Sequence, residues 1–297
     1  MAKQPPRVLS GQVAAITGGA RGIGRETARA FVAQGMKVAI GDLDLAAAQA
    51  TAQELGPDVA AFELNVTDKA SVEAFVDAAE AQLGELDVFV NNAGIMQLGG
   101  FLEEDDRTTQ RMIDINVNGV LYGMKAVLPR FQRRYRGHLV NIASSAGKAG
   151  FPGGATYCGT KHFVVGVSEA VRAELRDTPI EISCVMPVVV KTELAAGLQQ
   201  TRGVRHIEPS DVADAIVDAL QTPRFDVFVP RNIGPLTAVM GLLPRRGREA
   251  LGRVMKTDQV LVQRDDAARR AYELRASASE PGLEPGEDSK QLTQSTP

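Results

Sequence analysis

Tyr157 and Lys161 are the two residues whose types and spacing most clearly favour proton-transfer chemistry. Residues four apart lie on one face of a helix, so the phenol and the ammonium are expected to face the same way. A tyrosine titrates at about 10 in water, and a nearby cation favours its phenolate form. Ser144 lies thirteen residues before Tyr157 and follows a strand-like run, His138 to Ala143. The three side chains together predict a site that passes a proton to or from a substrate oxygen.

A glycine-rich turn, Thr17 to Gly24, follows the first apolar strand-like run and leads into a helical pattern. Glycines there permit a tight turn and close approach of an anion, and the helix N-terminus offers partial positive charge. The strand, turn and helix together predict a dinucleotide site, whereas the turn alone would indicate only a flexible connection. The residues of this turn that are expected to bind the cofactor are Gly18, Ala20, Arg21, Gly22, Ile23 and Gly24.

Asp42 ends the second strand-like run, eighteen residues beyond Gly24, where a carboxylate can accept hydrogen bonds from the adenosine ribose. A carboxylate there would repel a 2′-phosphate, so Asp42, with Leu43 beside it, favours NAD over NADP. Arg21 is the opposing argument, because a guanidinium in the turn can pair with a 2′-phosphate. We give more weight to Asp42, because its charge excludes a 2′-phosphate, whereas the Arg21 side chain can point into solvent without contacting the cofactor.

Short β-type runs alternate with longer helical patterns from Gln12 to Pro230, which predicts a doubly wound α/β domain. Its seven parallel strands are expected to be covered by helices on both faces. The expected strands are Val13 to Thr17, Lys37 to Gly41, Val59 to Glu63, Asp87 to Asn91, His138 to Ala143, Ile180 to Met186 and Val227 to Pro230. The expected helices are Gly22 to Gln34, Leu45 to Leu55, Lys69 to Leu83, Asp106 to Gln132, Tyr157 to Arg176 and Pro209 to Leu220.

The chain is expected to divide into a flexible N-terminus (1–9), one catalytic domain (10–230), a helical appendage (231–275) and a disordered tail (276–297). Within the appendage, Arg248 to Arg275 is expected to form one or two amphipathic helices. Packing of these helices on the body or on another subunit is the favoured interpretation. A peripheral contact with anionic lipid is the alternative.

With these motifs in place, the chain resembles the short-chain dehydrogenase/reductase family from about Gln12 to Pro230. The resemblance rests on the glycine turn, on Asn91-Asn92-Ala93-Gly94, on Asn116, and on the spacing of Ser144, Tyr157 and Lys161. It implies a Rossmann-fold, nicotinamide-dependent oxidoreductase acting on alcohols and carbonyls. Tyr157 would be the acid or base, Ser144 would hold the substrate oxygen, Lys161 would bind the nicotinamide ribose, and Asn116 would complete a water-linked proton relay. Further cofactor contacts are implied for Asn65, Val66, Asn92, Ala93, Gly94, Pro187, Val190 and Thr192.

The chain departs from the family pattern at two places in the cofactor site. Val188 stands where the family usually has glycine, and a β-branched residue cannot take a positive φ at low cost. The sequence therefore leaves the shape of that loop open. Asn65 stands where the family commonly has aspartate, and its amide oxygen can still accept from the adenine amino group.

The expected substrate wall is mostly apolar and favours a lipophilic secondary alcohol or ketone over a sugar or an acidic metabolite. It combines segments after three of the strands. The side chains expected to form it are Ile95, Met96, Leu98, Phe101, Phe151, Leu194 and Leu198.

Composition excludes several other kinds of protein. The net charge of −3 offers no positive field for nucleic acid, and the longest stretch without a charge, fifteen residues, is too short to span a membrane. The three histidines are scattered, so no metal is expected, and two cysteines with no signal-like N-terminus indicate a reduced, cytoplasmic protein. Family likeness implies a homodimer or homotetramer. The rival function is a non-catalytic dinucleotide-binding regulator or scaffold with the same fold.

Overall fold

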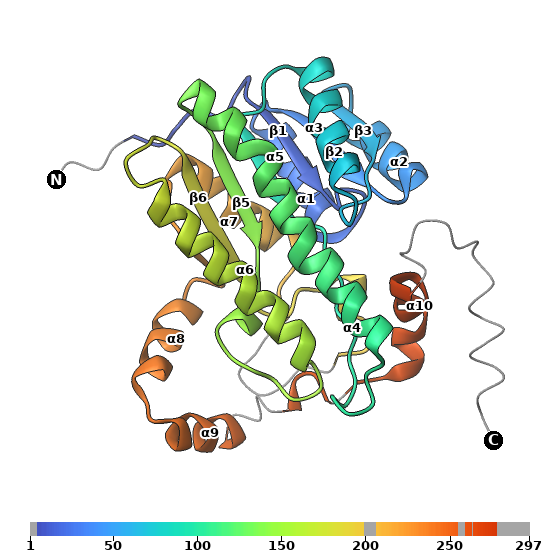
Figure 1. Cartoon of the computed structure of the whole chain (residues 1–297), viewed down its shortest axis with the longest axis vertical. Helices are drawn as coiled ribbons and strands as arrows, with labels where there is room; N and C mark the ends of the chain where they lie inside the picture. The colour runs from blue at the N-terminus through green and yellow to red at the C-terminus, as the bar shows by residue number, and fades with distance from the viewer. Residues whose placement is uncertain (1–4, 199–205, 255–258, 263, 278–297) are drawn as a thin grey trace.

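The central feature of the fold is one parallel sheet, with strand order β3-β2-β1-β4-β5-β6-β7 (Figure 1). The computed structural model describes residues 5–198, 206–254, 259–262 and 264–277. All seven expected strands are present, and their ends differ from the predictions by one residue at most. The strands are β1 (Val13–Thr17), β2 (Lys37–Asp42), β3 (Val59–Glu63), β4 (Val88–Asn91), β5 (His138–Ile142), β6 (Glu181–Pro187) and β7 (Asp226–Val229).

Helices cover both faces of the sheet, which confirms the doubly wound α/β prediction. Successive residues of a strand face opposite sides, so Ile16 packs with Phe31 of one helical layer while Ala15 packs with Phe75 of the other. One layer contains α1 (Gly22–Ala33), α2 (Leu45–Leu55) and α7 (Pro209–Gln221). The other contains α3 (Lys69–Leu83), α5 (Gly119–Arg134) and α6 (Ala155–Glu174).

The single helix expected over Asp106 to Gln132 is three elements instead. It consists of α4 (Asp106–Ile113), a π-helical turn (Asp114–Asn118) and α5. Such a turn inserts an extra residue without breaking the helical spacing of apolar residues, so periodicity does not reveal it. Here it contains Asn116, whose side chain is fully buried.

The appendage forms three helices: α8 (Ile233–Leu242), α9 (Arg245–Val254) and α10 (Asp266–Ser277). Two of them, α9 and α10, lie over the expected helical stretch Arg248 to Arg275. The prediction missed α8 because its segment contains glycine and proline. Pro235 is the third residue of α8, where a missing backbone N–H costs no helical hydrogen bond. Figure 1 shows α8 and α9 on one side of the carboxyl ends of the strands, and α10 on the other.

The two ends of the chain are described only in part. Residues 1–4 and 278–297 lie outside the described residues, so the predicted disorder of the tail is untested there. Within the expected flexible N-terminus, Leu9 is buried, and the Arg7 backbone N–H donates to the Gln221 carbonyl at 2.8 Å. Ala276 is likewise buried at the end of α10. In the part of the chain that the structure describes, no helix is both long and apolar enough to cross a membrane.

Candidate active site

The candidate site is a cavity of about 1120 Å³ at the carboxyl ends of the strands. β1 lies between β2 and β4, so the strand order reverses there, which is where open α/β sheets bind ligands. Most of the expected glycine-turn and strand-end residues border this cavity together with Ser144, Tyr157 and Lys161. One opening therefore contains both the candidate dinucleotide site and the candidate reacting groups.

The N-terminus of α1 is built to meet an anion. Its N-cap residue, Arg21, makes no side-chain capping hydrogen bond, whereas Asp44 and Asp68 cap α2 and α3. Gly18 has φ +65°, and a Cβ on it would lie 2.9 Å from the Ala93 Cα, so no other residue fits well. The turn thus leaves backbone N–H donors for a phosphate.

The predicted glycine-turn residues divide into two groups. Gly18, Arg21, Gly22 and Ile23 line the cavity. Ala20 and Gly24 are not on its wall. A Cβ on Gly24 would lie 2.2 Å from the Gly18 carbonyl oxygen, so this glycine serves the packing of the turn itself.

Asp42 faces the cavity and also organises the turns around it. Its carboxylate accepts from the backbone N–H of Ala20 at 3.0 Å and of Asp44 at 3.1 Å. Burial raises the pKa of Asp42, and these donors act in the opposite direction. Arg21 donates to the Asp44 carboxylate at 2.6 Å, so the cation that argued for NADP already has an anionic partner.

The adenine end of the site differs from the expectation at Asn65. The Asn65 side-chain oxygen accepts from the Thr67 backbone N–H at 3.0 Å and from the Thr67 hydroxyl at 2.8 Å. A carbonyl oxygen has two lone pairs, so this oxygen is already satisfied. Asn65 therefore shapes the turn after β3 rather than offering that oxygen to adenine, although Asn65, Val66 and Leu43 line the cavity.

The segment after β4 is fastened to the glycine turn. The Thr17 hydroxyl accepts from the backbone N–H groups of Asn92 and Ala93, both at 3.0 Å. The Asn92 amide donates to the carbonyls of Thr17 and Gly18, both at 2.9 Å. Gly94 follows, and a Cβ on it would come within 3.2 Å of the Asn116 amide oxygen and 3.5 Å of the Lys161 Nζ. Because glycine has no side chain, the part of the cavity beside Asn116 and Lys161 stays open.

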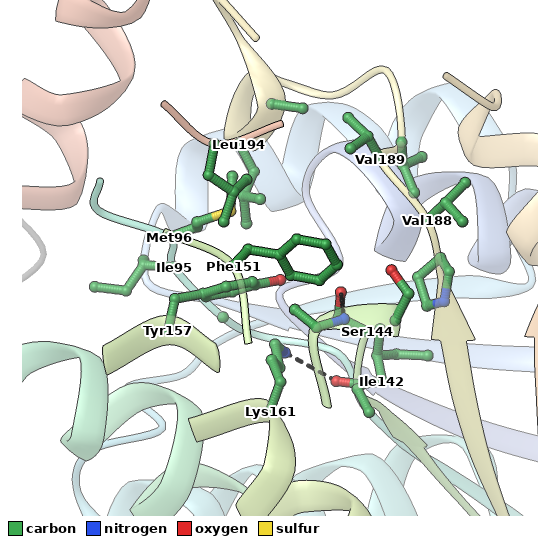
Figure 2. A pocket seen from close by; sticks show the side chains of 18 of the residues that line it. Ile95, Met96, Ile142, Ser144, Phe151, Tyr157, Lys161, Val188, Val189 and Leu194 are labelled. Atoms are coloured by element: carbon green, nitrogen blue, oxygen red, sulfur yellow. Dashed lines mark hydrogen bonds between the residues drawn. The ribbon is translucent and has the colours of Figure 1, made fainter. Parts of the chain in front are cut away.

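Ser144, Tyr157 and Lys161 converge beside the end of β5 (Figure 2). The Lys161 Nζ donates to the Ile142 carbonyl at 3.0 Å and lies 5.8 Å from the centre of the Tyr157 ring. The Ser144 hydroxyl accepts from the Ala146 N–H at 3.1 Å, which leaves its own proton to donate. The side chains of Tyr157 and Lys161 are both buried.

Burial dominates the proton affinities of this pair. It raises the pKa of Tyr157 to about 12, with a hydrogen bond from Ser144 acting in the lowering direction. It lowers the pKa of Lys161 to about 8. The expected lowering of the tyrosine pKa is therefore not observed, because desolvation dominates, and the phenol is protonated at neutral pH.

Asn116 lies behind the cavity wall rather than on it. Its amide oxygen accepts from the Ile95 N–H at 2.9 Å, and its amide nitrogen donates to the Ile95 carbonyl at 2.8 Å. The same nitrogen donates to the Thr160 hydroxyl at 3.1 Å. Asn116 thus holds the start of the substrate wall against α6, and its part in a proton relay stays a prediction.

Most of the expected apolar wall is present. Figure 2 shows Ile95, Met96, Phe151 and Leu194 gathered around Tyr157, and Leu198 also lines the cavity. One expectation was wrong, because Phe101 is 68% exposed. Leu98 does not reach the cavity surface but packs against the apolar cluster that contains Met96 and Tyr157. Loop residues 199–205 lie outside the described residues.

The wall also contains residues that the sequence reasoning missed, because they come from the appendage. Periodicity indicates that one face of α10 is apolar, but no local pattern says what that face packs against. The missed lining residues include Ile233, Leu236 and Met240 from α8, Arg245, Arg248 and Arg253 from α9, and Tyr272, Arg275 and Ala276 from α10.

The loop that begins at Pro187 takes an ordinary backbone shape. Among the described residues, Tyr135 is the only non-glycine residue with a positive φ, so Val188 needs no strained conformation. The Val188 N–H donates to the Val229 carbonyl at 3.0 Å, and Val190 forms an isolated bridge with Ile207. Pro187, Val190 and Thr192 all reach the cavity.

The other reactive side chains do not form a second centre. No cluster of metal-binding side chains occurs among the residues described. Cys158 lies beside Tyr157, but burial raises the pKa of its thiol, which disfavours the reactive thiolate.

Comparisons with known proteins agree with this geometry. A family model described as short chain dehydrogenase matches residues 12–203. The chain is 32% identical to 17-beta-hydroxysteroid dehydrogenase 13 of Rattus norvegicus, covering 84% of this chain and 85% of that one. It is 39% identical to sorbitol dehydrogenase of Cereibacter sphaeroides, covering 62% and 73%. A Burkholderia phymatum short chain dehydrogenase/reductase in complex with NAD superposes with a TM-score of 0.73 at 26% identity, covering 79% of this chain and 94% of that one.

Proposed function

This chain belongs to the short-chain dehydrogenase/reductase family, and from that premise we propose which residues carry its reaction and which substrates it takes. The family activity is nicotinamide-dependent oxidoreduction of CH–OH and C=O groups. When bound, the nicotinamide accepts or supplies the hydride. The observation that carries the proposal is the convergence of Ser144, Tyr157 and Lys161 next to Gly94, at the end of the dinucleotide cavity.

The protonated phenol of Tyr157 suits the carbonyl-reducing direction. It donates its proton to the oxygen that gains negative charge, and Ser144 supplies a second hydrogen bond to the same oxygen. In alcohol oxidation, the tyrosine takes the proton instead. Lys161, already anchored to the Ile142 carbonyl, is placed to bind the nicotinamide ribose and to stabilise phenolate.

NAD is the proposed cofactor. The proposal is supported by Asp42, which lines the cavity and would accept from the ribose hydroxyls, and by Asp44, which pairs with Arg21. The negative charge of Asp42 would repel a 2′-phosphate bound beside it. The NAD complex of the Burkholderia phymatum structure supports the same choice for a related fold.

Substitution of Tyr157 by phenylalanine tests the catalytic assignment. We expect NAD-linked turnover to fall about 10²- to 10⁴-fold, because the proton donor is lost. NADH binding, measured by fluorescence titration, should be unchanged within about twofold. Tyr122→Phe on α5 is the matched control, since Tyr122 packs against the core away from the cavity. Undiminished turnover in Tyr157→Phe would overturn the assignment.

The proposed substrates are lipophilic secondary alcohols or ketones. The relatives divide between hydroxysteroid and polyol dehydrogenases, and the side chains around Tyr157 favour the former, because they are almost all apolar. We expect kcat/KM for a steroid alcohol to exceed that for sorbitol by at least about 100-fold. A kinetic panel measured by NADH absorbance checks this, and a preference for polyols would contradict it.

We further propose that the protein is a cytoplasmic homo-oligomer in which α5 and α6 form the subunit contact. On α6, Gly159 and Gly166 have open space where a side chain would project, so a second helix can approach closely there. The cytoplasmic location is supported by Cys158 and Cys184, which are both buried and form no disulfide.

A further inference from the structure

Arg269 of α10 is the most deeply buried cation among the described residues, with 1% of its surface exposed. Its guanidinium donates to the Leu194 carbonyl at 2.9 Å and to the Ala196 carbonyl at 3.2 Å. It also donates to the Met96 carbonyl, and its Nε donates to the Glu273 carboxylate at 2.5 Å. One side chain therefore joins the segment after β4 to the segment after β6.

Tyr272, about one turn further along α10, also bonds to the segment after β4. Its hydroxyl accepts from the Met96 N–H at 2.7 Å, and its ring lies 4.9 Å from the Arg269 guanidinium carbon. Both backbone polar groups of Met96 are thus bonded to α10. Tyr272 is 8% exposed and lines the cavity, so it belongs to the wall as well as supporting it.

A third contact joins the start of α10 to the segment after β6. The Asp265 N–H donates to the Gly197 carbonyl at 2.8 Å, and Gly197 has φ +75°. A Cβ on Gly197 would lie 2.4 Å from the Asp265 carbonyl oxygen, so a side chain there would separate the two segments. The helix and the loop are therefore in direct backbone contact.

These contacts have a physical consequence for the wall. A guanidinium has five N–H donors in a rigid fork, and such a group is costly to bury unless its donors are satisfied. Here the acceptors are backbone carbonyls of both segments, so the two segments cannot separate without leaving a buried cation partly unsatisfied. The family match ends at residue 203, whereas α10 begins at Asp266.

We propose that Arg269 and Tyr272 are positioning residues that hold the Met96 and Leu194 segments at a set separation, and thereby determine which substrates fit beside Tyr157. The specificity part of this inference rests on the proposed function, because Met96 and Leu194 lie next to each other on one side of Tyr157 in the cavity (Figure 2). The helix that sets the width of the cavity, α10, thus comes from the appendage and not from the residues that the family model matches.

The test compares Arg269→Gln and Tyr272→Phe with Arg270→Gln, a matched control on the exposed side of the same helix. Arg269→Lys keeps the charge but loses the fork and tests rescue. The first readout is hydrogen–deuterium exchange of peptides covering Met96 and Leu194, which needs no substrate. The second is steady-state kinetics on 2-alkanols from butanol to dodecanol, together with NADH binding and the thermal midpoint.

We expect faster exchange in both peptides for Arg269→Gln, and in the Met96 peptide for Tyr272→Phe. KM for the longer 2-alkanols should change at least fivefold while kcat and NADH affinity change less than twofold, with Arg269→Lys intermediate and Arg270→Gln unchanged. Unaltered exchange in folded Arg269→Gln and Tyr272→Phe would overturn the inference, as would equal KM changes for short and long alkanols. If the wild-type protein oxidises no alkanol or steroid alcohol, the proposed function fails, while the exchange measurement still decides whether α10 holds the two segments.

Discussion

Tyr157, Lys161 and Asp42 show how burial and local partners set the chemistry of single residues in this site. Tyr157 and Lys161 are shifted in opposite directions by the same cause, because desolvation disfavours the phenolate and the ammonium alike. At Asp42 the important fact is its neighbours, since backbone donors hold the carboxylate and Asp44 holds Arg21. Residue type alone indicates what each group is able to do, and these partners decide what it does.

Asp42→Asn should weaken the preference for NAD. The amide keeps one acceptor oxygen but removes the charge that repels a 2′-phosphate. We expect the ratio of kcat/KM for NAD to that for NADP to fall about 10- to 100-fold, since like-charge contacts cost several kcal/mol. Steady-state kinetics with both cofactors measures the ratio. Asp58→Asn, at an exposed position before β3, is the control, and an unchanged ratio in Asp42→Asn would argue against the ribose assignment.

At the scale of elements, a buried chain of polar side chains connects β4, β5 and α6. The Asn91 amide donates to the Asn141 oxygen at 2.8 Å, and the Asn141 amide donates to the Ser168 hydroxyl at 2.8 Å. Ser168 in turn donates to the Val164 carbonyl at 2.6 Å. These groups lie in an otherwise apolar layer, so they fix α6, which carries Tyr157 and Lys161, in register with the two strands.

Asn141→Ala should reduce the free energy of unfolding by about 2 kcal/mol, because it leaves the Asn91 amide and the Ser168 hydroxyl without their partner. Urea denaturation monitored by circular dichroism measures this loss. Asn232→Ala, at an exposed position before α8 with no capping hydrogen bond, should change stability by less than about 0.5 kcal/mol. Equal stability of the two variants would show that the chain of amides contributes little.

At the scale of the whole molecule, the buried histidine of β5 couples global stability to pH. His138 bonds to the Ser183 hydroxyl at 2.9 Å, and burial lowers its pKa to about 3. Between about pH 6.5 and pH 3, His138 is therefore protonated in the unfolded chain but neutral in the folded protein. Unfolding by acid is favoured across that range, and the stabilisation is complete above about pH 6.5.

His138→Gln should make stability less dependent on pH in this range. For one proton, the wild-type protein should lose up to about 1.4 kcal/mol more than the variant for each pH unit below pH 6. Urea denaturation at pH 7, 6 and 5 measures the difference between the slopes. Parallel slopes for wild type and His138→Gln would refute the coupling.

Assembly is a second property of the whole molecule. If α6 packs against its copy, Gly166→Arg should place a charged side chain in the contact and produce monomers of about the chain mass, 31.6 kDa. Light scattering coupled to gel filtration measures the mass at micromolar concentration. Ala238→Arg on exposed α8 serves as the control. A wild-type particle of 31.6 kDa would contradict the oligomer itself.

The sequence alone was sufficient for the sheet and its helical layers, and it predicted the side chains that meet in the candidate site. Alternating strand and helix patterns are local and periodic, and the glycine turn and the Tyr157–Lys161 spacing are short-range signals. It missed the π-helical turn at Asn116, because an inserted residue leaves the apolar spacing almost unaltered. It also directed Phe101 to a wall from which this residue is absent, since Phe101 is 68% exposed.

Only the tertiary structure decided how the appendage closes the site. Arg269 and Tyr272 are 173 and 176 residues from their partner Met96 along the chain. Their partners are backbone groups, which every residue possesses, so no residue pattern identifies them. Tertiary packing likewise decided that desolvation raises the pKa of Tyr157 and that Arg21 pairs with Asp44. Local spacing determines which groups are available, whereas burial and long-range contacts determine their proton affinity, their partners and the shape of the space they face.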